Sequence, residues 1–225
     1  MNEPTGTTLD GLRLAPASGT ARQLVVLCHG IGVDGSDLLP IARLLAGALP
    51  DTAFALPHAP HRFTLAPDQG RQWFDLFDRT FGEVEQGARA TAPSLVRYLA
   101  DECSRLGLPH RAAVLAGFSQ GGMMALYAGL RMADPPGGIA ALAAALPGFA
   151  ETARDLRARP PVLLVHGERD EIVPVQMSRD AERLLRGLGV PVHAVYRPEL
   201  GHGIDDEAIG ALAAFCADLA VAGGA

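Results

Sequence analysis

The sequence predicts an α/β fold, with a mostly parallel central β-sheet covered by helices on both faces. Three observations lead to this prediction. Short, continuously apolar runs alternate with segments of helical periodicity along most of the chain. Glycine and proline bound these runs, whose length is that of strands buried on both faces. The length of 225 residues and the 48% hydrophobic content suit one domain, so we expect a single domain over 1–225.

The expected elements follow one another along the chain. Strands are expected at 23–28, 52–56, 111–116, 139–146, 161–166 and 192–196. Helices are expected at 37–49, from Pro93 to about 105, and at 121–130, 176–187 and 205–220. Pro93 is assigned to the first turn of its helix, where a missing amide hydrogen costs nothing. We expect the ends of the chain, 1–6 and 222–225, to fray.

Charge and composition exclude several classes of protein. The formal net charge of −6 and the scattering of the 19 basic residues argue against a nucleic-acid partner. No apolar run of 18 residues occurs, so no stable membrane insertion is expected. The amino terminus lacks the pattern of a secretory signal, which favours a cytoplasmic protein. The odd number of cysteines, Cys28, Cys103 and Cys216, indicates buried thiols rather than disulfides.

A serine stands in a Gly-x-Ser-x-Gly pattern directly after the strand at 111–116. The segment reads Gly117-Phe118-Ser119-Gln120-Gly121, and a helix is expected after it. This context predicts a nucleophile elbow, a sharp turn that lifts the serine oxygen clear of the sheet. The two glycines are needed because the flanking backbone comes so close that a Cβ would clash.

A base and an acid for this serine follow later in the chain. His202 lies between the last expected strand and the last expected helix, which would place its imidazole at the carboxyl edge of the sheet. Asp170 follows the strand at 161–166, and its arm is shorter than those of Glu168 and Glu171. The order Ser119, Asp170, His202 is that of an α/β-hydrolase triad, so we predict these as nucleophile, acid and base.

Two backbone amides are predicted to stabilise the oxyanion that attack by a serine generates. The N–H of Gln120 follows the nucleophile at the start of a helix. The N–H of Ile31 lies in the glycine-rich segment Cys28-His29-Gly30-Ile31-Gly32-Val33-Asp34-Gly35, after an early strand. No cofactor and no metal are expected for this chemistry.

Three other interpretations compete with the hydrolase. Gly30, Gly32 and Gly35 match the G-x-G-x-x-G pattern of a dinucleotide-dependent oxidoreductase, but no acidic residue ends the next strand to bind a ribose. A catalytically dead binding module of the same fold is the second alternative. A metal site at His58 and His61 is the third, and it lacks a third ligand and the spacing of a helix face.

Several longer segments resemble the phospholipase/carboxylesterase family of α/β-hydrolases, which includes acyl-protein thioesterases and small bacterial carboxylesterases. The matching segments span nearly the whole chain: His29-Gly30-Ile31-Gly32, Pro57-His58-Ala59-Pro60, Trp73-Phe74-Asp75, Gly117-Phe118-Ser119-Gln120-Gly121-Gly122, His166-Gly167-Glu168-Arg169-Asp170 and Gly201-His202. Val33 before Asp34 resembles the bacterial carboxylesterase branch more than the eukaryotic thioesterases. The resemblance implies the same three triad residues and the same two oxyanion donors. It also implies a fairly open site without a large lid domain.

The sequence thus predicts a serine hydrolase that cleaves carboxylic esters of short to medium acyl chains through an acyl-enzyme intermediate. Thioesters and lysophospholipids are further substrate classes left open, and the expected partner is a small-molecule ester. Aromatic residues punctuate the irregular segment 57–82, and long loops of this kind are usually functional. Phe63, Leu65 and Trp73 in this segment are candidates for lining an acyl groove. A homodimer is left open.

Overall fold

A computed structural model describes residues 7–78 and 80–223. It contains one seven-stranded sheet in the order β1-β3-β2-β6-β7-β8-β9. The strands are β1 (Gly11–Leu14), β2 (Gln23–Cys28), β3 (Thr52–Pro57), β6 (Ala113–Phe118), β7 (Gly138–Leu142), β8 (Val162–Gly167) and β9 (Val192–Arg197). β1 pairs antiparallel with β3, and every other neighbouring pair is parallel. The sheet is therefore mostly parallel, and its central strands are buried along their whole length except at Phe118, the last residue of β6.

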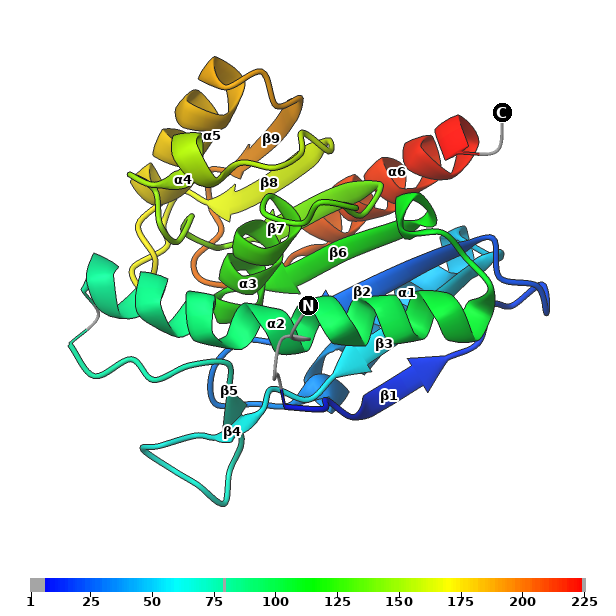
Figure 1. Cartoon of the computed structure of the whole chain (residues 1–225), viewed down its shortest axis with the longest axis horizontal. Helices are drawn as coiled ribbons and strands as arrows, with labels where there is room; N and C mark the ends of the chain where they lie inside the picture. Colours follow the sequence, from blue (N-terminus) through cyan, green and yellow to red (C-terminus); the bar gives the residue numbers. More distant parts are fainter. Residues whose placement is uncertain (1–6, 79, 224–225) are drawn as a thin grey trace.

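Helices cover both faces of this sheet (Figure 1). One face carries α2 (Phe81–Leu106), α3 (Gln120–Gly129), the short α4 (Thr152–Asp155) and α5 (Gln176–Gly187). The other face carries α1 (Leu39–Ala48), which follows the 3₁₀ turn η1 (Gly35–Leu38), and α6 (Asp206–Gly223). Each face buries its own apolar cluster against the alternating side chains of the strands. This is the α/β-hydrolase architecture that the alternation of strands and helices predicts.

Two predicted boundaries are wrong. The helix expected from Pro93 begins at Phe81, so Pro93 lies inside it. Thr80 caps this helix by accepting a 3.2 Å hydrogen bond from the Glu83 N–H. This local capping sets the start, which the proline obscured in the sequence. The strand expected to run to residue 146 ends at Leu142, because Ala143 adopts a φ of 51° that turns the chain away from the sheet.

The structure also contains elements that were not predicted from the sequence. The edge strand β1 was missed, as was the two-stranded sheet of β4 (His61–Arg62) and β5 (Arg71–Gln72) inside the aromatic segment. A 3₁₀ turn, η2 (His110–Ala112), precedes β6. Helix α6 extends to Gly223, whereas the expected fraying at 1–6 and 224–225 concerns residues outside those described.

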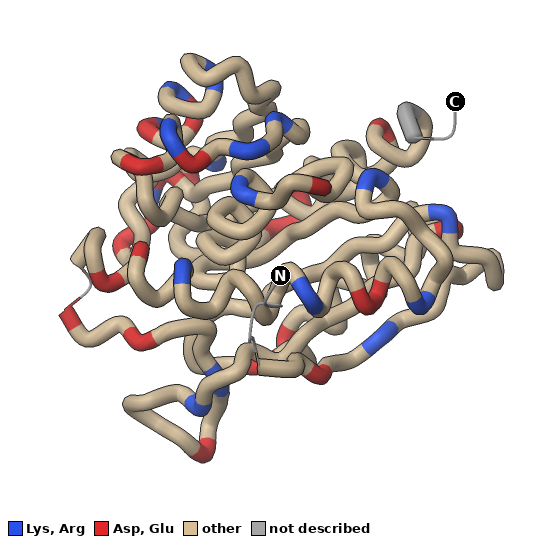
Figure 2. Tube along the Cα trace, viewed as in Figure 1, with Lys and Arg blue, Asp and Glu red and all other residues tan. Residues whose placement is uncertain are grey.

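Acidic and basic side chains are interspersed along the chain rather than gathered on one element (Figure 2). Among residues 7–78 and 80–223, the basic side chains therefore form no stripe of the kind that tracks a phosphate backbone. Over the described ranges 7–78 and 80–223, no helix combines the length and the apolar character needed to span a bilayer.

Candidate active site

Ser119 lies on a strained turn between β6 and α3. Its φ of 52° and ψ of −118° are unusual for a residue with a side chain, and the serine is only 6% exposed. A Cβ at Gly121 would overlap the carbonyl oxygens of Cys28 and His29, at the end of β2. A Cβ at Gly117 would overlap the backbone of Gly121. Both glycines are therefore required by close backbone contacts, as the sequence predicted.

Three side chains from three strand ends meet at this turn. His202 Nε2 lies 3.0 Å from Ser119 Oγ, and His202 Nδ1 lies 2.7 Å from Asp170 Oδ2. Ser119 follows β6, Asp170 follows β8 and His202 follows β9, so all three lie at the carboxyl edge of the parallel sheet. The carboxylate can only accept, so Nδ1 carries the hydrogen and Nε2 is free to accept from the serine hydroxyl.

Asp170 is held as a carboxylate by several donors. Its Oδ1 accepts hydrogen bonds from the backbone N–H groups of Ile172 at 2.9 Å and Val173 at 2.8 Å. Burial acts to raise the pKa of Asp170, but the His202 hydrogen bond and the two backbone donors outweigh it, so this pKa lies below its ordinary value. Glu168 instead pairs with Arg179 at the surface, and Glu171 is exposed. The structure thus brings the shorter carboxylate to His202.

Two other histidines are buried near the site without contacting Ser119. His29 donates from Nδ1 to Gly30 O at 2.6 Å and accepts at Nε2 from the Ala59 N–H at 3.0 Å. Burial lowers the pKa of His29 to about 4, so the ring is neutral near pH 7. His166 lies behind Asp170, with its Nε2 3.2 Å from Asp170 Oδ2. The sequence pattern did not indicate that this second imidazole lies beside the acid.

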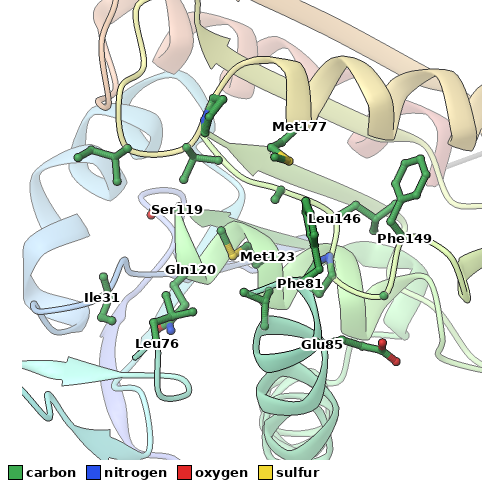
Figure 3. Close-up of a pocket in the computed structure, with 18 of the residues that line it drawn as sticks. Ile31, Leu76, Phe81, Glu85, Ser119, Gln120, Met123, Leu146, Phe149 and Met177 are labelled. Carbon is green, nitrogen blue, oxygen red and sulfur yellow. The ribbon is translucent and has the colours of Figure 1, made fainter. Parts of the chain in front are cut away.

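Ile31 and Gln120, the residues that carry the predicted amide donors, line a cavity together with Ser119 (Figure 3). Among the described residues, the Ile31 N–H has no hydrogen-bond acceptor, so it is available to a ligand. The loop that carries it is fixed by β5, because the Gly32 N–H donates to Arg71 O at 2.8 Å and the Arg71 N–H donates to Val33 O at 2.9 Å. Gln120 is the first residue of α3, where backbone N–H groups lack intrahelical partners.

The side chain of Gln120 has a separate role that the sequence did not reveal. Its Oε1 accepts from the Trp73 N–H and its Nε2 donates to Phe74 O, both at 2.8 Å. The Trp73 ring donates from Nε1 to His29 O at 2.9 Å. Gln120 therefore ties the aromatic segment to the nucleophile turn, while the ring of Trp73 ties the same segment to the loop that holds Ile31.

A cavity of about 700 Å³ opens beside Ser119. Most of its lining is apolar and comes from the start of α2, from α3, from α5 and from the segment 145–151 after β7 (Figure 3). The apolar residues that line it include Leu76, Phe81, Val84, Met123, Leu146, Phe149, Val173 and Met177, none of which was predicted. A volume of this size lies within the range of ~300–1,000 Å³ that is usual for small-molecule sites.

The three predicted groove residues divide between the cavity and the core. Phe63 and Leu65 line the cavity, and Leu65 is 76% exposed at its surface. Trp73 does not line it: the ring is 0% exposed and its N–H is used by His29 O. The prediction that Trp73 lines an acyl groove is therefore wrong, because packing and hydrogen bonding place this side chain in the core.

The structure does not support the dinucleotide site or the metal site that the sequence analysis considered. The glycines at 30, 32 and 35 lead into a 3₁₀ turn, and α1 begins only at Leu39, so no α-helix amino terminus follows them to receive a pyrophosphate. His58 Nδ1 accepts from the Gly35 N–H at 3.1 Å, while His61 is exposed. No group of three metal-ligating side chains occurs in the described part of the chain. All three cysteines are free and buried, as predicted, and burial raises the pKa of Cys216 to about 12.

Comparison with known proteins agrees with this geometry. The family model of phospholipase/carboxylesterase matches residues 10–219. Acyl-protein thioesterase 1 of Gibberella zeae is 30% identical over 218 residues, which cover 89% of this chain and 92% of that protein. Acyl-protein thioesterase 1 of Saccharomyces cerevisiae is 28% identical over 187 residues, which cover 78% and 82%. The crystal structure of esterase PE8 has a TM-score of 0.91 and 36% identity, and covers 95% of this chain and 100% of that one.

The family model spans the sheet, the serine turn and the segments that carry Asp170 and His202. They also decide between the alternatives that the glycine pattern left open, because the relatives are esterases and thioesterases rather than oxidoreductases. The chain belongs to the phospholipase/carboxylesterase family of α/β-hydrolases and is a hydrolase of the serine esterase type.

Proposed function

We propose that this protein hydrolyses carboxylic esters of short to medium acyl chains through an acyl-enzyme intermediate on Ser119. The observation that carries the proposal is the chain of hydrogen bonds from Ser119 Oγ through His202 to Asp170, at 3.0 Å and 2.7 Å, on the wall of an apolar cavity. Acyl thioesters are a second substrate class, supported by the two thioesterase relatives.

The reaction follows from the proton positions. His202 Nε2 takes the hydroxyl proton as Ser119 Oγ bonds to the carbonyl carbon, and the imidazolium is stabilised by Asp170. The oxyanion that forms accepts hydrogen bonds from the Ile31 and Gln120 N–H groups. His202 then returns the proton to the leaving alcohol or thiol as its bond to the carbonyl carbon breaks. Water attacks the acyl-enzyme in the same way, which releases the acid and restores Ser119.

The cavity supports an acyl chain as the bound part of the substrate. Its walls near Ser119 are made by Met123, Leu146 and Met177, which offer apolar contact and no fixed polar partner for a headgroup. Burial of each methylene is worth ~0.8 kcal/mol, so affinity should rise with chain length until the cavity is filled. We therefore expect kcat/KM to pass through an optimum along a series of acyl lengths.

Two experiments test the proposal together. A panel of p-nitrophenyl esters from acetate to dodecanoate, with matched acyl thioesters, should be hydrolysed with a length optimum. A fluorophosphonate probe should add one mass label per chain, mapped to Ser119 by peptide sequencing, and Ser119→Ala should take up none. A label on another residue would refute the nucleophile. Neither label nor turnover in the folded protein would instead support a binding module of the same fold.

A further inference from the structure

A second imidazole lies behind the carboxylate of Asp170. His166, near the end of β8, is 1% exposed, and its Nε2 lies 3.2 Å from Asp170 Oδ2. That oxygen is the one that accepts the 2.7 Å hydrogen bond from His202 Nδ1. The side chains of His166 and Asp170 are both fully buried. One carboxylate oxygen thus contacts two histidines, of which the proposed reaction uses only His202.

The partners of His166 determine where its hydrogen lies. Its Nε2 is 2.8 Å from Val173 O and 3.2 Å from the Asp170 carboxylate, and both of these groups can only accept. Nε2 must therefore carry a hydrogen. On the other side, Nδ1 is 2.7 Å from Ser178 Oγ, a hydroxyl that can donate to it and that also lies 3.0 Å from Ala144 O. Burial lowers the pKa of His166, although Val173 O and Asp170 oppose this, so the neutral Nε2–H ring is the form near pH 7.

We propose that His166 is a positioning residue that shares its Nε2–H between Val173 O and Asp170 Oδ2, and so sets the pH below which His202 stops acting as the base. The inference rests on the proposed function of Ser119, His202 and Asp170. A hydrogen bond to Oδ2 withdraws part of the negative charge that would otherwise stabilise the His202 imidazolium. With His166 in place, His202 gives up its proton more readily, and the enzyme stays active at lower pH.

Few other charged groups act on His166 and Asp170. The titratable groups that act on His166 are Asp170 and His202. The charged side chains of the neighbouring segments pair with one another nearer the surface: Glu168 with Arg179, Arg169 with Glu199, and Arg197 with Asp205. His202 itself contacts the uncharged Phe118 ring, at 4.9 Å between centroids, and Ser119. Apart from His202 itself, His166 is therefore the side chain whose removal acts most directly on the charge of Asp170 Oδ2.

Two amide substitutions of His166 distinguish the role of its Nε2 from that of its Nδ1. His166→Asn keeps an amide group at the place of Nδ1 but leaves nothing at Nε2, whereas the longer His166→Gln brings an amide nitrogen to the place of Nε2. We expect His166→Asn to move the acid limb of kcat/KM against pH upward by ~0.5–1 pH unit. His166→Gln should stay near the wild-type profile. Ser178→Ala removes the partner of Nδ1, together with the contact to Ala144 O, and leaves Nε2 in place. The acid limb of this variant should therefore also stay near wild type.

The inference is overturned if His166→Asn and His166→Gln shift the profile equally, if neither shifts it, or if Ser178→Ala shifts it as much as His166→Asn. Nitrogen NMR of the unmodified protein provides a test that needs no variant to fold: at pH 7, His166 should be protonated at Nε2 and not at Nδ1, and the opposite tautomer would overturn the inference. An NMR titration of the His202 ring in each variant measures the same shift along the pH axis without relying on turnover. A failure of the proposed esterase activity therefore leaves these measurements intact.

Discussion

The two halves of the site are built differently. On the reaction side, Ser119, Asp170 and His202 are held by backbone constraints: a strained φ, glycines in contact with carbonyl groups, and N–H donors to the carboxylate. On the cavity side, the walls come from several separate segments, mainly the start of α2, α3, α5 and 145–151, whose side chains meet only by packing (Figure 3). Backbone constraints tolerate few residue types, whereas an apolar wall tolerates many of similar volume.

This difference predicts that substitutions on the reaction side abolish turnover, while those on the cavity side change which substrate is preferred. In the proposed reaction, the residues of the reaction side act on the developing charge of every substrate, so their loss should lower kcat generally. The cavity contacts only the non-reacting chain, so its changes should alter relative kcat/KM values.

The largest effect is expected from Asp170→Asn. The asparagine carbonyl can still accept from Ile172 and Val173, but its amide would then donate to His202 Nδ1. That forces the hydrogen onto Nε2, where it can no longer accept from Ser119. Steady-state kinetics on an aryl ester should show kcat lower by about 10⁴-fold with the thermal midpoint little changed. Glu168→Gln, the matched change at a surface carboxylate, should remain within a few-fold of wild type; equal losses in both would contradict the assignment of the acid.

Gly121→Ala should have the next largest effect. Its Cβ would overlap the Cys28 and His29 carbonyls, so the end of β2 and the loop that carries Ile31 must move. A displacement of about 1 Å at a reacting group can cost ~10²-fold in rate, so we expect kcat to fall by about that factor or more. Gly47→Ala is the control, because nothing lies within 4 Å of the Cβ it would add to α1. That control should keep full activity and gain ~0.5–1 kcal/mol in the free energy of unfolding. Normal activity in Gly121→Ala would show that the turn is not backbone-limited.

On the cavity side, Met177→Trp should change substrate preference rather than abolish activity. Met177 lies on α5 and lines the cavity next to Ser119, so a larger ring there occupies space for the distal part of an acyl chain. The ratio of kcat/KM for an octanoyl ester to that for an acetyl ester should fall by ~10–100-fold. Leu44→Trp, at a 60% exposed position on α1 at the opposite face of the sheet, should leave the ratio unchanged. An unchanged ratio in a folded Met177→Trp would mean that acyl chains bind elsewhere.

The same contrast explains what the sequence could predict. The serine turn is a local pattern of adjacent residues with its own glycine requirement, and its strand and helix have clear periodicities, so Ser119 and its place in the fold were predicted. Asp170 and His202 followed from chain order and from the edge at which parallel strands end. Each of these inferences needs only one segment at a time, together with the topology of a parallel sheet.

The parts that failed depend on contacts between distant segments. Trp73 looks like a groove residue in an irregular segment, and only the Gln120 and His29 contacts reveal it as core. Met123 and Met177 look like ordinary apolar positions of two helices, because periodicity reports that a face is covered but not whether protein or ligand covers it. The contact of His166 with Asp170 arises from a tight turn that folds back on the strand end, which residue spacing alone does not show.

Lowering the pH should have the smallest effect on turnover near neutral pH. It should nevertheless lower the free energy of unfolding clearly. His29 lies behind the Ile31 loop, and its pKa is lowered from 6.5 to about 4 by burial. In unfolded chains this ring binds a proton below pH 6.5, whereas in the folded protein it does so only near pH 4. The stability that its neutral form provides is complete above pH 6.5 and is lost as pH falls toward 4, by roughly 3 kcal/mol in total. The lowered pKa of His166 acts with the same sign.

Urea unfolding at steps from pH 7 to pH 4 should show this decline in the free energy of unfolding. Hydrogen exchange over the same range should show that amides around Gly30 and Ala59 lose protection before those of α2, which packs on the cavity side. A free energy of unfolding that stays constant from pH 7 to pH 4 would contradict this prediction. So would a loss of amide protection in α2 before the segment around His29.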